Sequence, residues 1–482
     1  MRILSVASEL HPLVKTGGLA DVTGALPPAL IAQGMDVRSL IPAYASVLKA
    51  MRKHELVLRY KDLFGAPARL LACTIRGQDL LLLDSPLLFG REGGPYSDPR
   101  GIDWPDNWRR FAALSAVAAD VAAGAIEGWR ADVVHAHDWQ AAMTAAYVRH
   151  SRAPEVPVVV TIHNLAFQGR FDARIFPNLG LPATAFAVDG VEYYGGVGFL
   201  KAGLQYADAI TTVSPTYAQE IRTQEYGMGL DGLLQGRSDV VHGIVNGIDT
   251  TEWDPSTDPH LLGHFSARSL ADRKQNRKAL EQRFALTPGK GPIFAVISRL
   301  TWQKGIDLII DAIEHIIVHG GRLVVLGSGD GALEGALLSA ASRHRGLIGV
   351  VTGYDEPLAH LMQGGADAIL IPSRFEPCGL TQLYGQRYGT VPIAARTGGL
   401  ADTIIDGNEA ALAAGVATGI LHDPGEGVAL KTAISRAIGL YADPARWQTV
   451  QKQGMRADYS WAKSSALYVE LYRSLIKETG EA

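Results

Sequence analysis

The stretch Lys-Thr-Gly-Gly-Leu-Ala-Asp-Val at residues 15–22 organises the first half of the chain. It follows a short apolar run at residues 3–7 and precedes apolar residues spaced as on a helix. A strand, a glycine turn and a helix form a phosphate-binding geometry, because glycine lets backbone N–H groups approach an anion and the helix directs its positive dipole end there. Lys15 adds a full positive charge to this turn.

Nearly the same stretch occurs in the second half, as Arg-Thr-Gly-Gly-Leu-Ala-Asp at residues 396–402. It also follows a run typical of a strand, at residues 391–395. The shared motif in matching contexts indicates two related α/β halves that face one ligand. The alternative is a coincidence of common small residues.

Length and charge narrow the class of protein. A chain of 482 residues is too long for one core and predicts two large domains or three ordinary ones. A net charge of −4 argues against general binding to nucleic acid or anionic membrane. Cys73 and Cys378 are far apart, which argues against a disulfide scaffold or zinc knuckle. Without a signal segment or long apolar run, we expect a soluble cytoplasmic protein.

Short apolar runs alternate with helical patterns along the whole chain. The strands expected lie at residues 3–7, 37–41, 80–83, 133–136, 158–162 and 209–213, then at 293–298, 323–326, 349–352, 368–371 and 391–395. This alternation predicts doubly wound parallel sheets with ligands at the carboxyl ends of their strands. A turn signal and a polar stretch after it place a domain boundary near Gly243, and the final segment reads as an amphipathic helix.

Histidines stand at the ends of two expected strands in the first half. His135 and His137 share a face of one strand, with Asp138 next to them, and His163 and Asn164 follow another strand. Such spacing can bind a metal, but no third group of ligands is evident. We therefore prefer hydrogen bonding to a polar ligand or to backbone.

Two cations follow the first expected strand of the second half. Arg299 and Lys304 stand where a diphosphate would bind, and together they can offset the negative charge that grows on a departing nucleoside diphosphate. The alternative is a pair of solvated surface cations. Residues 327–332 also match G-x-G-x-x-A, but no acidic residue ends a following strand, so a nicotinamide-dependent oxidoreductase is a weak alternative.

A second dense stretch, Pro-Ser-Arg-Phe-Glu-Pro-Cys-Gly-Leu-Thr, covers residues 372–381. Glu376 lies between aromatic and proline neighbours after an expected buried strand. This position suits a carboxylate that makes polar interactions with a ligand at a cleft. Gly379 and Leu380 are expected to open a helix whose N–H groups face the same place. The alternative is an acid that satisfies local amides at a helix N-terminus.

Taken together, these motifs resemble the bacterial glycogen synthase and plant starch synthase family. The matching segments are residues 15–22, 137–139, 163–164, 246–249, 299–305, 376–380 and 397–400, so the resemblance spans essentially the whole chain. K-T-G-G-L is specific to that family, whereas E-P-x-G-L is shared with many nucleotide-sugar glucosyltransferases. One departure is Tyr384, where relatives outside the family often carry a second glutamate, and this weakens a two-carboxylate mechanism.

The resemblance implies a GT-B fold, with two Rossmann-like doubly wound parallel-sheet domains facing a deep cleft. The expected domains are residues 1–243, onto which a C-terminal helix at 458–479 packs back, and residues 244–457. It implies transfer of glucose from ADP-glucose to the non-reducing end of an α-1,4-glucan such as glycogen, with retained anomeric configuration. No metal or other cofactor is expected, and the choice of ADP-glucose over UDP-glucose rests on the resemblance alone.

The resemblance also implies roles for individual residues. The catalytic residues it implies are Glu376, Lys304, Arg299, His163 and Asp138. The substrate-binding residues it implies are Lys15, Gly17, Gly18, Asp21, Asn164, Asn246, Tyr354, Cys378, Gly379, Leu380 and Thr381. Arg299 and Lys304 would bind the diphosphate and Tyr354 would stack near the adenine. His163, Asn246 and Glu376 would surround the glucosyl unit, with Asp138 near the acceptor, and Asp21 would either fix the loop or contact substrate.

The two alternatives to a glucosyltransferase are a binding protein without turnover and a phosphorolytic enzyme. A nucleotide- or glucan-binding protein without turnover would keep the glycine loops but could lose Glu376 or Lys304, and both are present. A phosphorolytic enzyme would need a lysine bound to pyridoxal phosphate, and no sequence context marks such a lysine.

Overall fold

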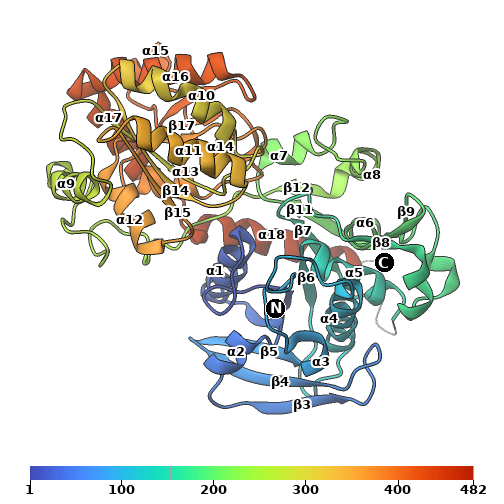
Figure 1. The fold of residues 1–482 in the computed structure, drawn as a ribbon. Coiled ribbons are helices and arrows are strands. Elements are labelled where there is room, and N and C mark those ends of the chain that lie inside the picture. Colours follow the sequence, from blue (N-terminus) through green and yellow to red (C-terminus); the bar gives the residue numbers. More distant parts are fainter. Residues whose placement is uncertain (152–154, 481–482) are drawn as a thin grey trace. The chain divides into compact units, whose positions relative to one another are not determined.

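The computed structural model describes residues 1–151 and 155–480. The chain forms two compact units: unit 1 contains Met1–Gly247 and the segment from Trp461 onward, and unit 2 is Ile248–Ser460 (Figure 1). The sequence placed the boundaries between the two domains at residues 243 and 458, whereas residues 244–247 belong to unit 1 and residues 458–460 belong to unit 2. Tyr459 and Ser460 stay in unit 2 because the Ile248 N–H donates to the carbonyl of Tyr459 at 2.8 Å and Ile248 forms a parallel bridge with Ser460.

A nine-stranded sheet forms the centre of unit 1, in the order β12-β11-β7-β6-β1-β2-β5-β4-β3. The strands are β1 (Arg2–Val6), β2 (Asp36–Pro42), β3 (Glu55–Tyr60), β4 (Ala68–Ile75), β5 (Gln78–Asp84), β6 (Val133–His137), β7 (Val158–Ile162), β11 (Ala209–Thr212) and β12 (Val241–Gly243). Pairing is parallel except where β4 runs antiparallel to β5 and β3. The strand order reverses between β1 and β6, so the ends of these two strands are where a doubly wound sheet binds its ligand.

Helices cover the sheet of unit 1, and a small antiparallel sheet lies beside it. The helices are α1 (Gly18–Ala32), α2 (Ala45–Ala50), α3 (Pro86–Phe89), α4 (Asn107–Ala122), α5 (Asp138–Arg149), α6 (Phe199–Tyr206), α7 (Pro215–Glu220), α8 (Asp231–Gly236) and α18 (Trp461–Gly480), and the small sheet is β8 (Arg170–Asp172), β10 (Gly196–Gly198) and β9 (Glu192–Tyr193). Trp461, Tyr468 and Tyr472 of α18 share a buried cluster with Leu26 and Leu30 of α1. The final helix therefore completes the core of unit 1.

Unit 2 is built on a six-stranded sheet that is parallel throughout, in the order β15-β14-β13-β16-β17-β18. Its strands are β13 (Ile293–Ile297), β14 (Arg322–Gly327), β15 (Ile348–Thr352), β16 (Ala368–Ile371), β17 (Val391–Ala395) and β18 (Ile420–His422). Its helices are α9 (Arg273–Arg283), α10 (Ile306–Val318), α11 (Gly331–Arg343), α12 (Glu356–Gly365), α13 (Thr381–Arg387), α14 (Gly398–Thr403), α15 (Glu409–Ala414), α16 (Gly427–Tyr441) and α17 (Pro444–Arg456). The order reverses between β13 and β16, which marks the expected ligand site of this unit.

Every strand expected from the sequence is present within two residues of its expected bounds. The antiparallel pair β3 and β4, the edge strands β12 and β18, and the small sheet were not expected. The two copies of Thr-Gly-Gly-Leu-Ala-Asp occupy unlike places, because the first follows β1 and the second follows β17, the neighbour of β16 away from the reversal. Among the described residues, no helix is long and apolar enough to cross a membrane.

Candidate functional site

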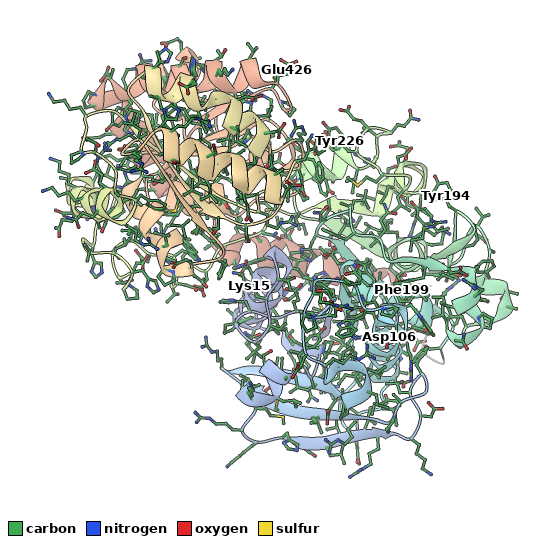
Figure 2. The ribbon with its side chains drawn as sticks, viewed as in Figure 1. Lys15, Asp106, Tyr194, Phe199, Tyr226 and Glu426 are labelled. Atoms are coloured by element: carbon green, nitrogen blue, oxygen red, sulfur yellow. The ribbon has the colours of Figure 1, made fainter. Side chains whose placement is uncertain are left out.

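The first glycine loop joins β1 to α1 in unit 1. Lys15, labelled in Figure 2, places its Nζ 2.7 Å from Oδ1 of Asp21, a residue of the first turn of α1. Gly17 has extended backbone, and a Cβ added there would meet no atom within 4 Å. Asp21 therefore pairs with the loop's own cation, and the loop keeps open space beside Gly17, next to Gly18 at the start of the helix.

A carboxylate that the sequence did not single out holds this loop. Glu9 is buried at 2% exposure, and it accepts hydrogen bonds from the N–H and the hydroxyl of Thr16 at 2.5 and 2.6 Å. The hydroxyl of Tyr96 also donates to Glu9. Hydrogen bonds to an ionised carboxylate are stronger than neutral ones, so Glu9 fixes the backbone just before the two glycines.

The histidines at the ends of β6 and β7 form one buried cluster. Nδ1 of His137 lies 3.1 Å from Nε2 of His163. His135 uses both ring nitrogens, with Nε2 at 2.5 Å from the Thr161 hydroxyl and Nδ1 at 2.8 Å from the Tyr472 hydroxyl of α18. Burial lowers the pKa of His135 to about 3 and that of His137 well below its usual range. These two rings are therefore neutral, and their hydrogen bonds are made with side chains rather than with the ligand or backbone groups expected from the sequence.

Asp138 begins α5 with a left-handed backbone, φ +56°. Its Oδ1 accepts the His163 N–H at 2.7 Å. Burial raises the pKa of its carboxyl to about 7, although backbone hydrogen bonds from His163 and Asn164 lower it, and the charge of Glu9 raises it further. Asp tolerates this backbone better than most residues, but a strained non-glycine position costs of order 1–3 kcal/mol and is typical of functional sites.

Asn246 lies just beyond β12 and is buried. Its side-chain oxygen has no hydrogen-bond partner among the described residues. Leaving a buried acceptor unpaired costs about 1–3 kcal/mol, so such a group calls for an explanation. A ligand hydroxyl would supply the missing donor.

In unit 2, the loops after β13 and β16 bring two predicted residues together. Nζ of Lys304 lies 2.5 Å from Oε2 of Glu376, which also accepts the hydroxyl of Ser373 at 2.9 Å. Glu376 is buried, whereas Arg299, at the start of the loop that ends with Lys304, is exposed. The cation and the carboxylate thus meet where the strand order reverses.

Arg374 fastens these two loops to each other. Its guanidinium pairs with Asp307 of α10 at 2.7 Å, donates to the carbonyl of Trp302 at 2.7 Å, and lies 4.3 Å from the centre of the Trp302 ring. Its backbone N–H donates to the carbonyl of Gln303 at 2.9 Å. A bidentate ion pair with added backbone bonds restricts both loops, which positions Lys304 against Glu376.

The second glycine stretch packs under this carboxylate. The N–H of Gly399 donates to the carbonyls of Glu376 and Pro377, both at 3.1 Å. A Cβ at Gly398 would lie 2.0 Å from the Glu376 carbonyl oxygen, and one at Gly399 would lie 2.2 Å from that of Cys378. The amide of Gly399 is therefore already used, and the two glycines of this copy allow close backbone packing against residues 376–378.

The remaining predicted residues of unit 2 lie in two places: residues 378–381 lead into α13, and Tyr354 follows β15. Cys378 is buried and forms no disulfide, and its carbonyl accepts a hydrogen bond from Gln382 at 2.9 Å. Gly379 has φ +71°, and Leu380 and Thr381 begin α13. Tyr354 is 73% exposed, and its hydroxyl donates to Glu356 at 2.8 Å.

Tyr384 has its own packing role. Its ring stacks on that of Trp253 with centroids 3.7 Å apart and an interplanar angle of 15°. The residue that replaces a second glutamate thus belongs to an aromatic stack of unit 2.

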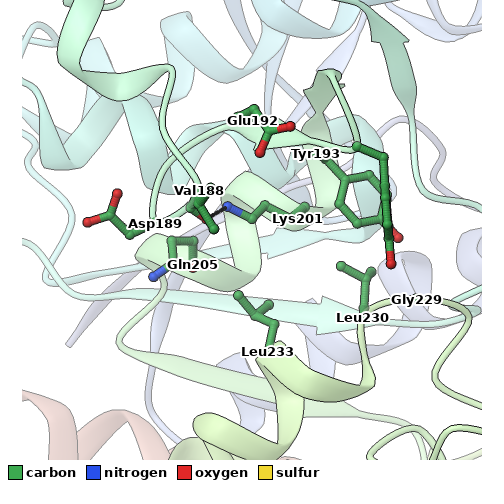
Figure 3. A pocket seen from close by; sticks show the side chains of 10 residues that line it. Val188, Asp189, Glu192, Tyr193, Lys201, Gln205, Gly229, Leu230 and Leu233 are labelled. Carbon is green, nitrogen blue, oxygen red and sulfur yellow. Dashed lines mark hydrogen bonds between the residues drawn. The ribbon is translucent and has the colours of Figure 1, made fainter.

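A cavity of about 560 Å³ lies elsewhere in unit 1 and was not expected from the sequence (Figure 3). It is lined by Val188, Asp189, Glu192, Tyr193, Tyr194, Lys201, Gln205, Gly229, Leu230 and Leu233. Lys201 donates to the carbonyls of Val188 and Gly190, and burial lowers the pKa of its ammonium. None of the predicted site residues lines this cavity.

Comparison with known proteins covers both units. The model of the starch synthase catalytic domain matches residues 2–236, and that of glycosyl transferases group 1 matches residues 278–453. The catalytic domain of starch synthase IV from Arabidopsis thaliana, bound to ADP and acarbose, has a TM-score of 0.89 and 31% identity, covering 98% of this chain and 99% of that one. The fold is therefore GT-B, with two Rossmann-like domains. Sucrose-phosphate synthase from Thermosynechococcus elongatus shares the fold at 18% identity and a TM-score of 0.60.

Curated relatives match the chain over its whole length. The glycogen synthase of Mesorhizobium japonicum is 62% identical over 478 residues, 99% of each chain. Glycogen synthase 1 of Rhizobium meliloti is 62% identical over 477 residues, again 99% of each. With the cation and carboxylate at the reversal point of a Rossmann-like sheet, these matches show that the chain belongs to the glycogen synthase family of glycosyltransferases.

Proposed function

We propose that this enzyme transfers glucose from ADP-glucose to the non-reducing end of an α-1,4-glucan with retention of configuration, elongating glycogen. The observation that carries the proposal is the pair of Lys304 and Glu376 at the reversal point of unit 2, 2.5 Å apart. The relative from Arabidopsis thaliana, which binds ADP and acarbose, supports a nucleotide and a glucan as ligands. The two cysteines of this enzyme form no disulfide, which agrees with a location in the reducing cytoplasm.

Lys304 and Arg299 neutralise the diphosphate of the donor, and no metal is needed. An ammonium has three N–H donors, so Lys304 can keep Glu376 and bind a phosphate oxygen at the same time. The exposed guanidinium of Arg299 is available for a second phosphate contact. Fixed cations aimed at the growing charge of a leaving group stabilise the transition state most. Treatment with EDTA should therefore leave the transfer rate unchanged.

Glu376 orients glucose hydroxyls and stabilises positive charge on the ring. Its Oε2 is held by Lys304 and Ser373, on the side where the leaving phosphate is bound. A nucleophile for double displacement would have to lie on the opposite face of the sugar. The acceptor hydroxyl therefore attacks C1 as the bond to phosphate breaks, and its proton passes to the departing phosphate oxygen. Mass spectrometry should find no glucosyl ester on Glu376.

The other residues bind the substrates. In unit 1, the unpaired oxygen of Asn246 and the ring of His163 bind glucosyl hydroxyls, and Asp138, which holds the His163 backbone, lies near the acceptor. Lys15, with Gly17, Gly18 and Asp21, supplies a second anion contact, with Asn164 beside it. In unit 2, the exposed ring of Tyr354 stacks on the adenine, and residues 378–381 contact the donor through their backbone.

The test is release of ADP with ADP-glucose and glycogen together, compared with each alone and with UDP-glucose as the matched donor. Release that needs both ADP-glucose and glycogen is expected, with an α-linked product by NMR. Equal release without glycogen would indicate hydrolysis, and turnover with UDP-glucose alone would contradict the donor assignment.

A further inference from the structure

Unit 2 contains a cluster of ligand atoms that the reaction does not use. Glu252, Glu356 and His360 each offer one such atom, and these atoms all lie within 4.8 Å of one another. Glu356 is the first residue of α12 and His360 lies four residues later, so one helix face presents both side chains. Glu252 comes from the distant segment before Trp253.

His360 is held ready to bind a cation through one nitrogen. It is 2% exposed, and its Nδ1 lies 2.7 Å from the buried carboxylate of Asp258, which also accepts the Tyr388 hydroxyl at 2.6 Å. The ring of Trp253 stacks on it with centroids 3.7 Å apart and an interplanar angle of 14°. Because Nδ1–H donates to Asp258, the lone pair of Nε2 is left for a metal, and a carboxylate behind a histidine is the usual support of a metal ligand.

The two glutamates complete a donor set. Oε2 of Glu356 accepts the Tyr354 hydroxyl at 2.8 Å, which leaves its other oxygen for a metal. The backbone N–H of Glu252 donates to Asp249 at 3.2 Å, so its segment is fixed. One imidazole and two carboxylates suit Zn²⁺ and similar divalent transition metals rather than Mg²⁺ or Ca²⁺, which prefer oxygen ligands alone.

We propose that Glu252, Glu356 and His360 bind one divalent transition metal ion, with Zn²⁺ as the representative, and with water in the remaining coordination position. The ion would tie the start of α12 to the segment around residue 252. The site is separate from the diphosphate cations, so it does not rest on the proposed function and adds no step to the transfer. An ion that binds only the folded chain raises its stability by mass action.

The test uses the full chain, stripped with EDTA and then freed of it, titrated with Zn²⁺ against a chromophoric chelator. The variants are Glu252→Gln and Glu356→Gln, and the matched control is Glu409→Gln, whose side chain is 87% exposed. Wild type and control should take up one tight equivalent, and each site variant should bind it at least about tenfold more weakly, since even supporting residues cost 10–100-fold in affinity. Unchanged affinity in both site variants would overturn the proposal.

Co²⁺ gives a second readout that does not depend on stability. Wild type with one equivalent of Co²⁺ should show visible absorption bands of a site of low coordination number, and Glu252→Gln should lose them. Glu252 is exposed, so this variant tests the site without disturbing the buried contacts of His360. Bands of equal strength in Glu252→Gln would overturn the proposal as well.

Discussion

The two copies of Thr-Gly-Gly-Leu-Ala-Asp have the same residues and different environments. The first copy leaves open space at Gly17, pairs Lys15 with Asp21 and begins a helix of 15 residues. The second presses its glycines against the backbone of residues 376–378 and begins a helix of six residues. A shared motif therefore forms an open loop in one unit and supports the position of a carboxylate in the other, and the strand that precedes the motif decides between the two.

If the second copy holds Glu376 beside Lys304, removal of the Lys304 cation should lower activity more than the other substitutions proposed. Lys304→Ala should lower kcat by about 10²–10³-fold, because a fixed donor at a developing charge is worth that much. Binding of ADP-glucose should weaken far less. Lys304→Gln keeps most of the side-chain stem and separates charge from packing. Steady-state kinetics with unchanged kcat in Lys304→Ala would contradict the assignment.

The glycines themselves should separate the two copies. Gly399→Ala places a Cβ 2.2 Å from the Cys378 carbonyl oxygen, so unfolding should become easier by about 1–3 kcal/mol, the usual cost of overpacking. Gly17→Ala meets no atom within 4 Å and should change stability by less than about 0.5 kcal/mol. Urea unfolding of both full-length variants measures the difference. Equal destabilisation would remove the contrast between the copies.

Each copy follows a basic residue, Lys15 in the first and Arg396 in the second, and substitutions of these two residues form a matched pair of variants. Lys15→Ala should raise KM for ADP-glucose by about tenfold, roughly 1.4 kcal/mol, because it removes a cation from a ligand loop. Arg396 is half-exposed and lies 3.6 Å from Asp406, so Arg396→Ala should leave KM within twofold, since exposed ion pairs are worth about 0–1 kcal/mol. Similar KM values for the two variants would show that Lys15 does not contact the donor.

Acid should weaken the unit that carries the first copy. The pKa of His135 is about 3 when folded and 6.5 in the free side chain, so its stabilising effect is full above pH 6.5 and is lost as pH falls toward 3. Asp138, with its pKa raised to about 7, acts in the opposite sense and favours folding as pH falls. In His135→Gln, stability should depend less on pH below 6.5, by at most about 1.4 kcal/mol per pH unit. His54→Gln, at an exposed position, is the control, and equal pH dependence in both variants would contradict this account.

The sequence predicted most strands of both central sheets, and it placed Lys304 and Glu376 after two of them without predicting that they meet. Lys304 and Glu376 follow buried strands, and the carboxyl ends of neighbouring parallel strands converge, so their contact follows from topology. The periodicity of strands does not predict contacts between residues that loops bring together. Glu9 meets Thr16 and Tyr96 through loop conformation, and nothing in the spacing of these residues marks that contact.

Contacts between residues that lie far apart in the chain could not be predicted from the sequence for the same reason. His135 and Tyr472 are 337 residues apart, and their hydrogen bond exists only because α18 returns to unit 1. The packing role of Gly399 depends on a backbone that folds back from residues 376–378. A local motif predicts the turn that it forms, but tertiary structure decides which residues pack against that turn.

The return of α18 has a consequence for synthesis of the chain. Unit 2 is one continuous segment, Ile248–Ser460, whereas the core of unit 1 lacks Trp461, Tyr468 and Tyr472 until the residues of α18 have been translated. At about 5–20 residues per second, the ribosome needs on the order of ten to forty seconds to make unit 2. Unit 1, most of which is made before unit 2, is therefore completed only after unit 2, and the apolar surface that α18 covers stays exposed until then.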